Sequence, residues 1–328
     1  KYVRQLMVIA IPVIISSAAG EISIIVDNAM ASGFFGKASV SILFYAKTML
    51  TLITGVITVS VTTALFPKIA EFGQGGKIED MKGSISSAVV TTMLLVIPAT
   101  IGMMVLSNPV IELVYQRNAF TSEDTIAVAS MMVSYAPFII FQSITDVVDR
   151  GFYAVGDSKT PVIIVVIQQL INVILNAILI QFFGLNGIAY ATVISTIIGS
   201  SLMIYKFRDN FGSFKFKNTL LSIFKILIIT GIMALVAGKI YAVTADKLPH
   251  ILAVFVAILL AALVYGFLIL LVRIPEVMEL INTVYHKYFR KRKAQKHINT
   301  NRSEHIELPK QNRRQIENTR KYEYRKRR

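Results

Sequence analysis

Long apolar stretches alternate with short polar or glycine-containing segments along most of the chain. A helix that crosses a bilayer core about 30 Å thick needs about 20 apolar residues. Eight stretches meet this requirement, at residues 5–32, 38–66, 83–107, 124–151, 160–183, 187–206, 218–242 and 250–274. We therefore predict an all-α integral membrane protein with about eight transmembrane helices. Residues 108–123 are more polar, and we expect a short interfacial helix and a loop there.

The cations of the loops indicate how the chain is oriented in the membrane. With alternating spans, the loops and N-terminus on one side carry 11 Lys and Arg residues, and those on the other side carry 3. Cytoplasmic loops are the ones enriched in Lys and Arg. We therefore predict that both ends of this chain are cytoplasmic. Residues 286–328, with 16 Lys and Arg against 4 Glu, are expected to form a disordered cytoplasmic tail that binds anionic lipid, and nucleic acid is not an expected partner.

Composition narrows the possible chemistry. Only 16% of the residues are charged, against about a quarter in soluble domains. The chain has no cysteine, and its four histidines all lie at position 250 or later, which excludes disulfides, cysteine-based metal sites and histidine relays in most of the apolar region. No phosphate loop, zinc-protease motif or serine nucleophile elbow is present. We therefore expect a transporter and not an enzyme, with no cofactor except a possible coupling ion.

Polar residues inside the apolar stretches are candidate functional groups, because they are costly in hydrocarbon. In the first stretch, Ser16, Gly20, Ser23 and Asp27 share one helical stripe, and Glu21 lies beside it. Two carboxylates in one span indicate a watery cavity or an ion site. The alternative is a hydrogen bond between helices with Glu21 protonated.

The second stretch carries a longer polar stripe. Its members follow at intervals of three or four residues: Lys47, Thr51, Thr54, Thr58 and Thr62. We interpret Lys47 as a contact for an anionic substrate, with Glu21, Thr51 and Thr58 as further substrate-binding candidates. The structural alternative is that the Lys47 side chain extends to the membrane surface.

Two further groups of polar residues lie on later stretches. Gln168, Asn172 and Asn176 are spaced four residues apart and face one way; amides of this kind also join helices to each other. Near the cytoplasmic end of the fourth stretch, Asp146 and Arg150 are spaced for a helical ion pair. We assign these two residues, with Arg117 of the outer loop, gating or structural roles.

Several ordered segments resemble the MurJ/MviN lipid II flippase family. Residues 115–125 (YQRNAFTSEDT) resemble a loop of that family, and residues 150–161 (RGFYAVGDSKTP) resemble its Arg-x-Phe-Tyr-x-x-x-Asp-Thr-Lys-Thr-Pro motif. Shorter matches occur at 26–27, 45–46, 171–172 and 187–192. The resemblance covers residues 5–210 and weakens towards 274. One departure is that Lys47 precedes Thr48, where the family has a polar residue followed by Arg.

The resemblance implies helices 7–14 of a fourteen-helix, two-lobe transporter of the multidrug/oligosaccharidyl-lipid/polysaccharide exporter superfamily. Residues 1–210 would form the six spans of the C-terminal lobe, 211–285 two additional helices and a membrane-exit segment, and 286–328 the tail. The implied activity is flipping of lipid II across the bacterial cytoplasmic membrane by alternating access. The implied partners are this undecaprenyl-linked precursor and the N-terminal lobe. A related exporter of lipid-linked polysaccharide or drugs, or a non-transporting protein of the same fold, is the alternative.

The resemblance also makes the first, fifth and sixth stretches neighbours, and this indicates an ion site. Asp27, Asn172, Asn176 and Thr192 would then lie at similar depths, roughly 8–17 Å below the outer surface at 1.5 Å per residue. One carboxylate, two amides and a hydroxyl offer hard oxygen ligands with a single negative charge. We therefore predict a monovalent-cation site, with sodium as the ion, against the alternative of a packed polar seam without an ion.

Overall fold

The computed structural model describes residues 2–213, 216–275 and 277–278. Residues 1–274 form one compact unit, which contains α1 to α10. The helices are α1 (Tyr2–Phe35), α2 (Ala38–Ile53), the π-helix η1 (Thr54–Thr58), α3 (Val59–Gln74), α4 (Ile78–Val105), α5 (Ser107–Tyr115), α6 (Ser122–Ala154), α7 (Lys159–Phe183), α8 (Asn186–Phe211), α9 (Phe216–Thr244) and α10 (His250–Val272).

The predicted all-α membrane fold is confirmed. Six of the eight predicted spans fall within a helix, with α2, η1 and α3 together forming the second, while 83–107 and 250–274 each extend two residues beyond the ends of α4 and α10. Seven spans in the described part of the chain are long and apolar enough to cross a membrane. The remaining predicted span, residues 5–32, is helical throughout as part of α1, and most side chains of its first half lie outside the described residues. The short helix predicted within 108–123 is found as α5, and its position at the membrane interface stays a prediction. The basic tail at 286–328 lies outside the described residues.

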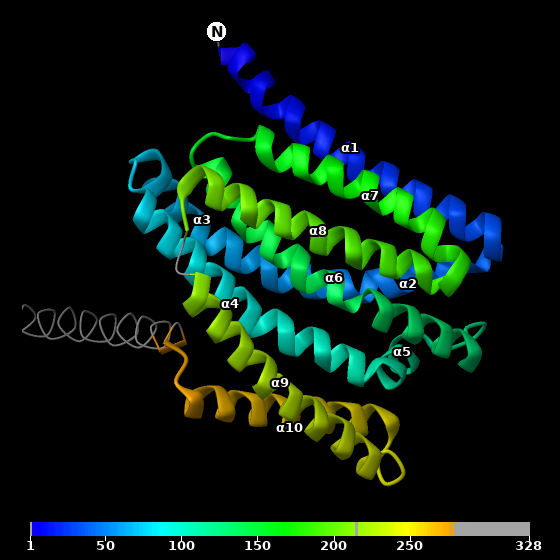
Figure 1. Cartoon of the computed structure of the whole chain (residues 1–328). Coiled ribbons are helices and arrows are strands. Elements are labelled where there is room, and N and C mark those ends of the chain that lie inside the picture. Colours follow the sequence, from blue (N-terminus) through cyan, green and yellow to red (C-terminus); the bar gives the residue numbers. More distant parts are fainter. Residues whose placement is uncertain (1, 214–215, 276, 279–328) are drawn as a thin grey trace, which may run out of the picture. The chain divides into compact units, whose positions relative to one another are not determined.

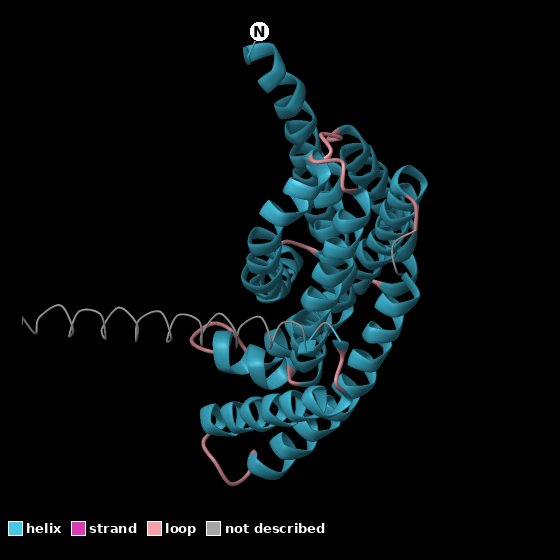
Figure 2. Cartoon of the chain, turned by 90° about the vertical axis from the view of Figure 1, so that its left-hand side faces the viewer, coloured by secondary structure: helices cyan, strands magenta, loops and turns pink. Residues whose placement is uncertain are grey.

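Helices that are distant in sequence lie side by side in this unit. The row of neighbours runs α1, α7, α8, α6, α4, α9 and α10, as Figure 1 shows. Helices α2 and α3 both pack against α6, and α1 also contacts α2. Figure 2 shows the same helices turned by 90° about the vertical axis, with no strand in the described part of the chain. This order brings α1, α2, α7 and α8 close enough to form one polar cluster.

Much of the outer surface of the row is apolar. Large side chains such as Ile25, Val56 and Leu235 are 65–69% exposed, a pattern expected where lipid and not water surrounds the helices. Polar side chains are instead found inside, among them Asn172, Asn176 and Thr196 at 2% exposure or less. Because hydrocarbon offers no hydrogen bonds, these groups must find partners on neighbouring helices.

Helices α7 and α8 approach closely at Gly187. A Cβ atom built on Gly187 would contact the carbonyl oxygen of Leu179 and would lie 2.7 Å from the backbone nitrogen of Ile180. Only a residue without a side chain fits against this backbone. The contact fixes the start of α8 against the end of α7 and so sets the height of Thr192 relative to Asn172.

The π-helix η1 changes the direction of the polar stripe in the second span. A π-helix holds more residues per turn than an α-helix, and one extra residue turns everything after it by about 100°. Thr51, before η1, is exposed, whereas Thr58 and Thr62 are only 2% and 6% exposed. The stripe predicted from 47 to 62 is therefore not one continuous face.

The two ends of α8 give a direct test of membrane orientation. We expect a cysteine at Asn186 to react with a membrane-impermeant maleimide from outside the cell, and a cysteine at Arg208 to react only from the cytoplasm. The chain contains no cysteine of its own, so each label reports one position. Labelling of position 186 only from the cytoplasmic side would reverse the predicted orientation.

Candidate functional site

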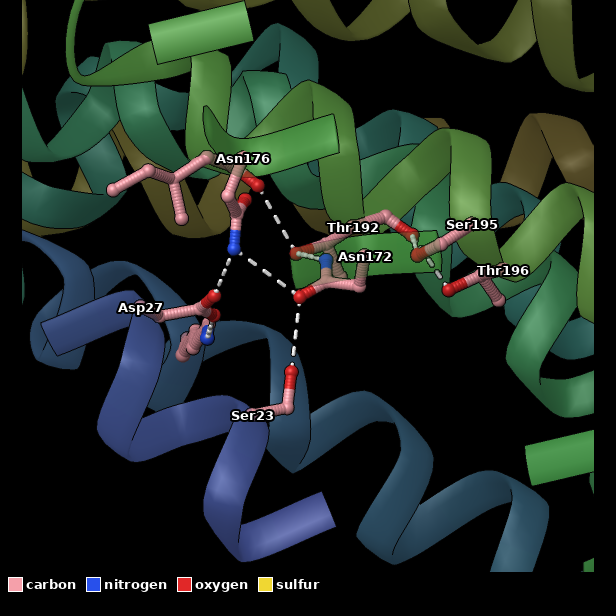
Figure 3. Close-up of polar contacts among 9 residues, drawn as sticks. Ser23, Asp27, Asn172, Asn176, Thr192, Ser195 and Thr196 are labelled. Atoms are coloured by element: carbon pink, nitrogen blue, oxygen red, sulfur yellow. Dashed lines mark hydrogen bonds and ion pairs between the residues drawn. The ribbon is translucent and has the colours of Figure 1, made fainter. Parts of the chain in front are cut away.

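The cluster begins with two short polar stripes that face each other on α1 and α7. Ser23 and Asp27 on α1, and Asn172 and Asn176 on α7, are each four residues apart, so each pair lies on one face of its helix. Ser23 Oγ donates a hydrogen bond to Asn172 Oδ1 at 2.9 Å. Asn176 Nδ2 donates to Asp27 Oδ1 at 2.6 Å and to Asn172 Oδ1 at 3.2 Å. The two stripes therefore interlock, as Figure 3 shows.

Helix α8 contributes the third side of the cluster. Asn172 Nδ2 donates to Thr192 Oγ1 at 3.1 Å, and Thr192 Oγ1 donates to the carbonyl oxygen of Ile188 at 3.0 Å. The hydroxyls of Ser195 and Thr196 both donate to the Thr192 carbonyl oxygen. The structure thus brings together all four residues that the sequence suggested for a cation site.

Lys47 of α2 supplies the positive charge of the cluster. Its Nζ donates to Asp27 Oδ2 at 2.8 Å and lies 5.0 Å from the ring centroid of Tyr135 on α6. The Asp27 side chain is 3% exposed, and the Lys47 side chain is 27% exposed. A carboxylate buried to this degree requires a compensating cation, and here the compensating cation belongs to the protein itself.

Sequence reasoning placed Lys47 and Asp27 in different sites and did not single out Tyr135. A usable signal was present, because the two charges lie on spans joined only by the short segment 33–37. Ionisable groups within a membrane usually pair with one another. Tyr135 gave no comparable signal, since a tyrosine in an apolar helix is most often part of the core.

The donor set of the cluster bears on whether a free cation fits. Both oxygens of Asp27 accept hydrogen bonds, one from Lys47 and one from Asn176. Asn176 Oδ1 is buried and has no hydrogen-bond partner among the described residues, and the Tyr135 hydroxyl lies near Lys47 and Thr192. The residue types therefore suit sodium, but in this arrangement the ammonium of Lys47 is paired with the Asp27 carboxylate.

The other substrate-binding candidates do not join this cluster. Glu21 is exposed on α1, and Thr51 is exposed on α2 with its hydroxyl donating to the Thr48 carbonyl oxygen at 3.0 Å. Thr58 is buried, and its hydroxyl lies 2.8 Å from Ser143 Oγ of α6. Thr58 therefore joins two helices, while Glu21 and Thr51 are accessible from outside the unit.

The residues assigned to gating lie apart from the cluster. Gln142 Nε2 donates to Asp146 Oδ1 at 2.8 Å, and Arg150 Nε lies 3.6 Å from Asp149 Oδ1. The helical spacing predicted an ion pair between Arg150 and Asp146. In the structure, Arg150 instead pairs with its sequence neighbour Asp149. The Arg150 guanidinium also lies 5.8 Å from the ring of Phe66 on α3, so it links α6 to α3. Arg117 is exposed in the loop after α5.

Comparison with known proteins identifies the family. Residues 1–261 match the model of the family described as lipid II flippase MurJ. The chain is 26% identical over 269 residues to a protein named probable lipid II flippase MurJ from Thermotoga maritima, covering 82% of this chain and 53% of that protein. It is 31% identical over 164 residues to the lipid II flippase MurJ of Thermosipho africanus, covering 50% of this chain and 34% of that protein.

Solved structures agree with this result. A structure titled lipid II flippase MurJ, inward closed conformation, superposes with a TM-score of 0.67 at 28% identity, covering 82% of this chain and 54% of that chain. A Vibrio cholerae MATE transporter is similar in fold alone, with a TM-score of 0.55 at 18% identity, covering 74% of this chain and 56% of that chain. The chain spans about half the length of these proteins or less. Because the family model matches most of its residues, the chain belongs to the lipid II flippase MurJ family.

Proposed function

We propose that this chain forms one half, the C-terminal one, of a flippase for lipid II, the undecaprenyl-linked peptidoglycan precursor. Membership of the family supports this function. The observation that carries it within the structure is the ion pair of Lys47 and Asp27, embedded with two amides in a unit much of whose surface is apolar. A purely structural membrane protein has no need of such a costly polar cluster. Alternating exposure of a cavity to the two membrane faces would move the headgroup.

Lys47 is the proposed contact for the pyrophosphate of the substrate. Its side chain is partly exposed, and Thr51 follows it by one helical turn on the same side of α2. Glu21 of α1 is also exposed and would face the polar part of the headgroup. Thr58 would hold the second span against α6 through its contact with Ser143.

The cation site remains part of the proposal. Asp27, Asn172, Asn176 and Thr192 would hold sodium through oxygen atoms once Lys47 is no longer bound to the carboxylate. The bound ion would supply a positive charge, and its gradient would supply energy for transport. Further proposed partners are the N-terminal lobe and, for the basic tail, anionic lipid of the cytoplasmic membrane.

Reconstitution provides the test of function. We expect the full-length protein to flip fluorescent lipid II in liposomes, and we expect residues 1–328 alone to be inactive. The reason is that exposed polar groups of the isolated half, such as Glu21, would face hydrocarbon where the other lobe belongs, at a cost of several kcal/mol each. Dithionite quenching of the flipped fluorophore measures the activity, with protein-free liposomes as control. Flipping by residues 1–328 alone would contradict the two-lobe proposal.

A further inference from the structure

The negative charge of Asp27 is fully engaged by groups of the chain. Oδ2 accepts from the ammonium of Lys47 at 2.8 Å, and Oδ1 accepts from the amide nitrogen of Asn176 at 2.6 Å. One carboxylate in a medium of low dielectric constant can balance one positive charge, but a second cation beside the first would be repelled. A free ion can therefore reach Asp27 only when Lys47 leaves it.

We propose that the Lys47 ammonium is a tethered cation that excludes a free monovalent cation from Asp27, and that an anionic headgroup releases it. Substrate and cation would then favour each other's binding, although they bind at different atoms. The second step rests on the proposed function, whereas the exclusion step rests on the ion pair alone.

The structure shows why Lys47 is the partner that moves. Asp27 is 3% exposed, whereas Lys47 is 27% exposed and is attached through a flexible four-carbon stem. Besides Asp27, its described partner is Tyr135, whose ring centroid lies 5.0 Å from the ammonium and whose hydroxyl also interacts with it. Of these two partners only Asp27 is a carboxylate, so a competing anion has to replace one charged partner. An anion on the exposed side of α2 could draw Lys47 outward without any shift of the backbone.

The structure also shows how the remaining groups could accept a replacement ion. Asn176 presents its amide nitrogen to Asp27 and Asn172, while its Oδ1 is buried and has no hydrogen-bond partner within the described ranges. A half-turn of this amide would exchange nitrogen for oxygen. The Oδ1 atoms of Asp27, Asn172 and Asn176 would then face one another. Such a group of oxygens is unfavourable unless a cation lies between them. The present orientation of Asn176 is therefore the one that suits Asp27 paired with Lys47.

Because binding free energies are reciprocal, the release of Lys47 by substrate has a definite consequence. A headgroup that raises the affinity for sodium must itself bind more tightly when sodium is present, and by the same factor. Removing the Lys47 charge would abolish this coupling and leave Asp27 open to sodium at all times.

The exclusion step can be measured with sodium itself as the probe. Full-length protein is titrated with NaCl against choline chloride at constant ionic strength, and the midpoint of thermal unfolding is recorded. We expect a weak response in the unmodified protein, at least a tenfold lower apparent Kd for sodium in Lys47→Gln, and no response in the double variant Asp27→Asn/Lys47→Gln. Lys37→Gln, an exposed lysine of the preceding loop, should behave like the unmodified protein. An unchanged sodium affinity in Lys47→Gln would overturn the proposal.

The release step is tested by adding undecaprenyl pyrophosphate to the same titrations. We expect the sodium affinity of the unmodified protein to rise several-fold and that of Lys47→Gln to stay constant. The expected rise is measured on the unmodified protein, so it does not depend on whether a variant folds. If Lys47→Gln does not fold, Lys47→Ala replaces it. If Lys47→Gln binds sodium more tightly as expected but the protein does not flip lipid II, the tethered cation is supported and the proposed function is rejected. If the protein flips lipid II but the unmodified protein and Lys47→Gln bind sodium equally well, the proposed function is supported and the tethered cation is rejected.

Discussion

Replacing Gly187 by alanine should separate α7 from α8 and strongly reduce the amount of folded protein. The new Cβ would contact the Leu179 carbonyl oxygen and lie 2.7 Å from the Ile180 nitrogen. Both are backbone atoms, so no side-chain rotation relieves the overlap. Overpacking of a tight interior costs about 1–3 kcal/mol and occasionally more, and we expect at least the upper end of that range here. The bond from Asn172 to Thr192 would be lost with it.

A matched glycine provides the control for this experiment. Gly83 lies in α4, and a Cβ built there meets nothing within 4 Å. Gly83→Ala should be neutral or slightly stabilising, because alanine is favoured over glycine within a helix by about 1 kcal/mol. Size-exclusion profiles and unfolding midpoints of the two variants in detergent measure the difference. Equal stability of Gly187→Ala and Gly83→Ala would show that the helices can move apart without loss.

Loss of one partner from the Lys47–Asp27 pair should have an effect that depends on which partner is removed. Lys47→Met leaves a carboxylate that is 3% exposed without its cation. Breaking a buried ion pair in this way costs about 3–5 kcal/mol, and the 27% exposure of Lys47 places our expectation at the lower end. Asp27→Asn should cost less, because the freed lysine can extend its ammonium towards the exposed side.

The double variant Asp27→Asn/Lys47→Met separates charge from packing. It removes both charges together, so it should recover most of the stability lost in Lys47→Met. Unfolding midpoints are compared in choline chloride without sodium, so that no added ion replaces the lysine. Similar losses in both single variants, with no recovery in the double variant, would indicate that shape and not charge holds this part of the cluster.

The helices themselves were predictable because the thickness of the membrane fixes the length of an apolar helix. Their order in the row was not, since hydrophobic periodicity does not tell which helix lies beside which. The contact between α1 and α7 was expected only through the family resemblance. The separation of the chain into residues 1–210 and 211–285 stays a prediction.

The candidate site was partly predictable from the helical period of its polar residues. The α7 stripe and the Ser23–Asp27 part of the α1 stripe were correctly identified, because both helices keep a regular period of 3.6 residues between their polar groups, whereas the Ser16 side chain lies outside the described residues. The Lys47–Thr62 stripe was read with that same period across η1, where the backbone departs from it. The buried position of Thr58 follows from this departure. The substrate-binding and cation-binding roles remain predictions.

The order of the helices in the row differs from their order in the sequence, and this determines when each contact of the cluster can form during synthesis. Asp27 and Lys47 are 20 residues apart, whereas Asp27 and Asn176 are 149 residues apart. At about 5–20 residues per second, the ribosome adds Lys47 within about 1–4 s of Asp27, but Asn176 only after about 7–30 s. During that interval α1 has neither α7 nor α8 as a neighbour. The lysine of the very next helix would then be available to neutralise Asp27 in the nascent chain before the rest of the cluster exists.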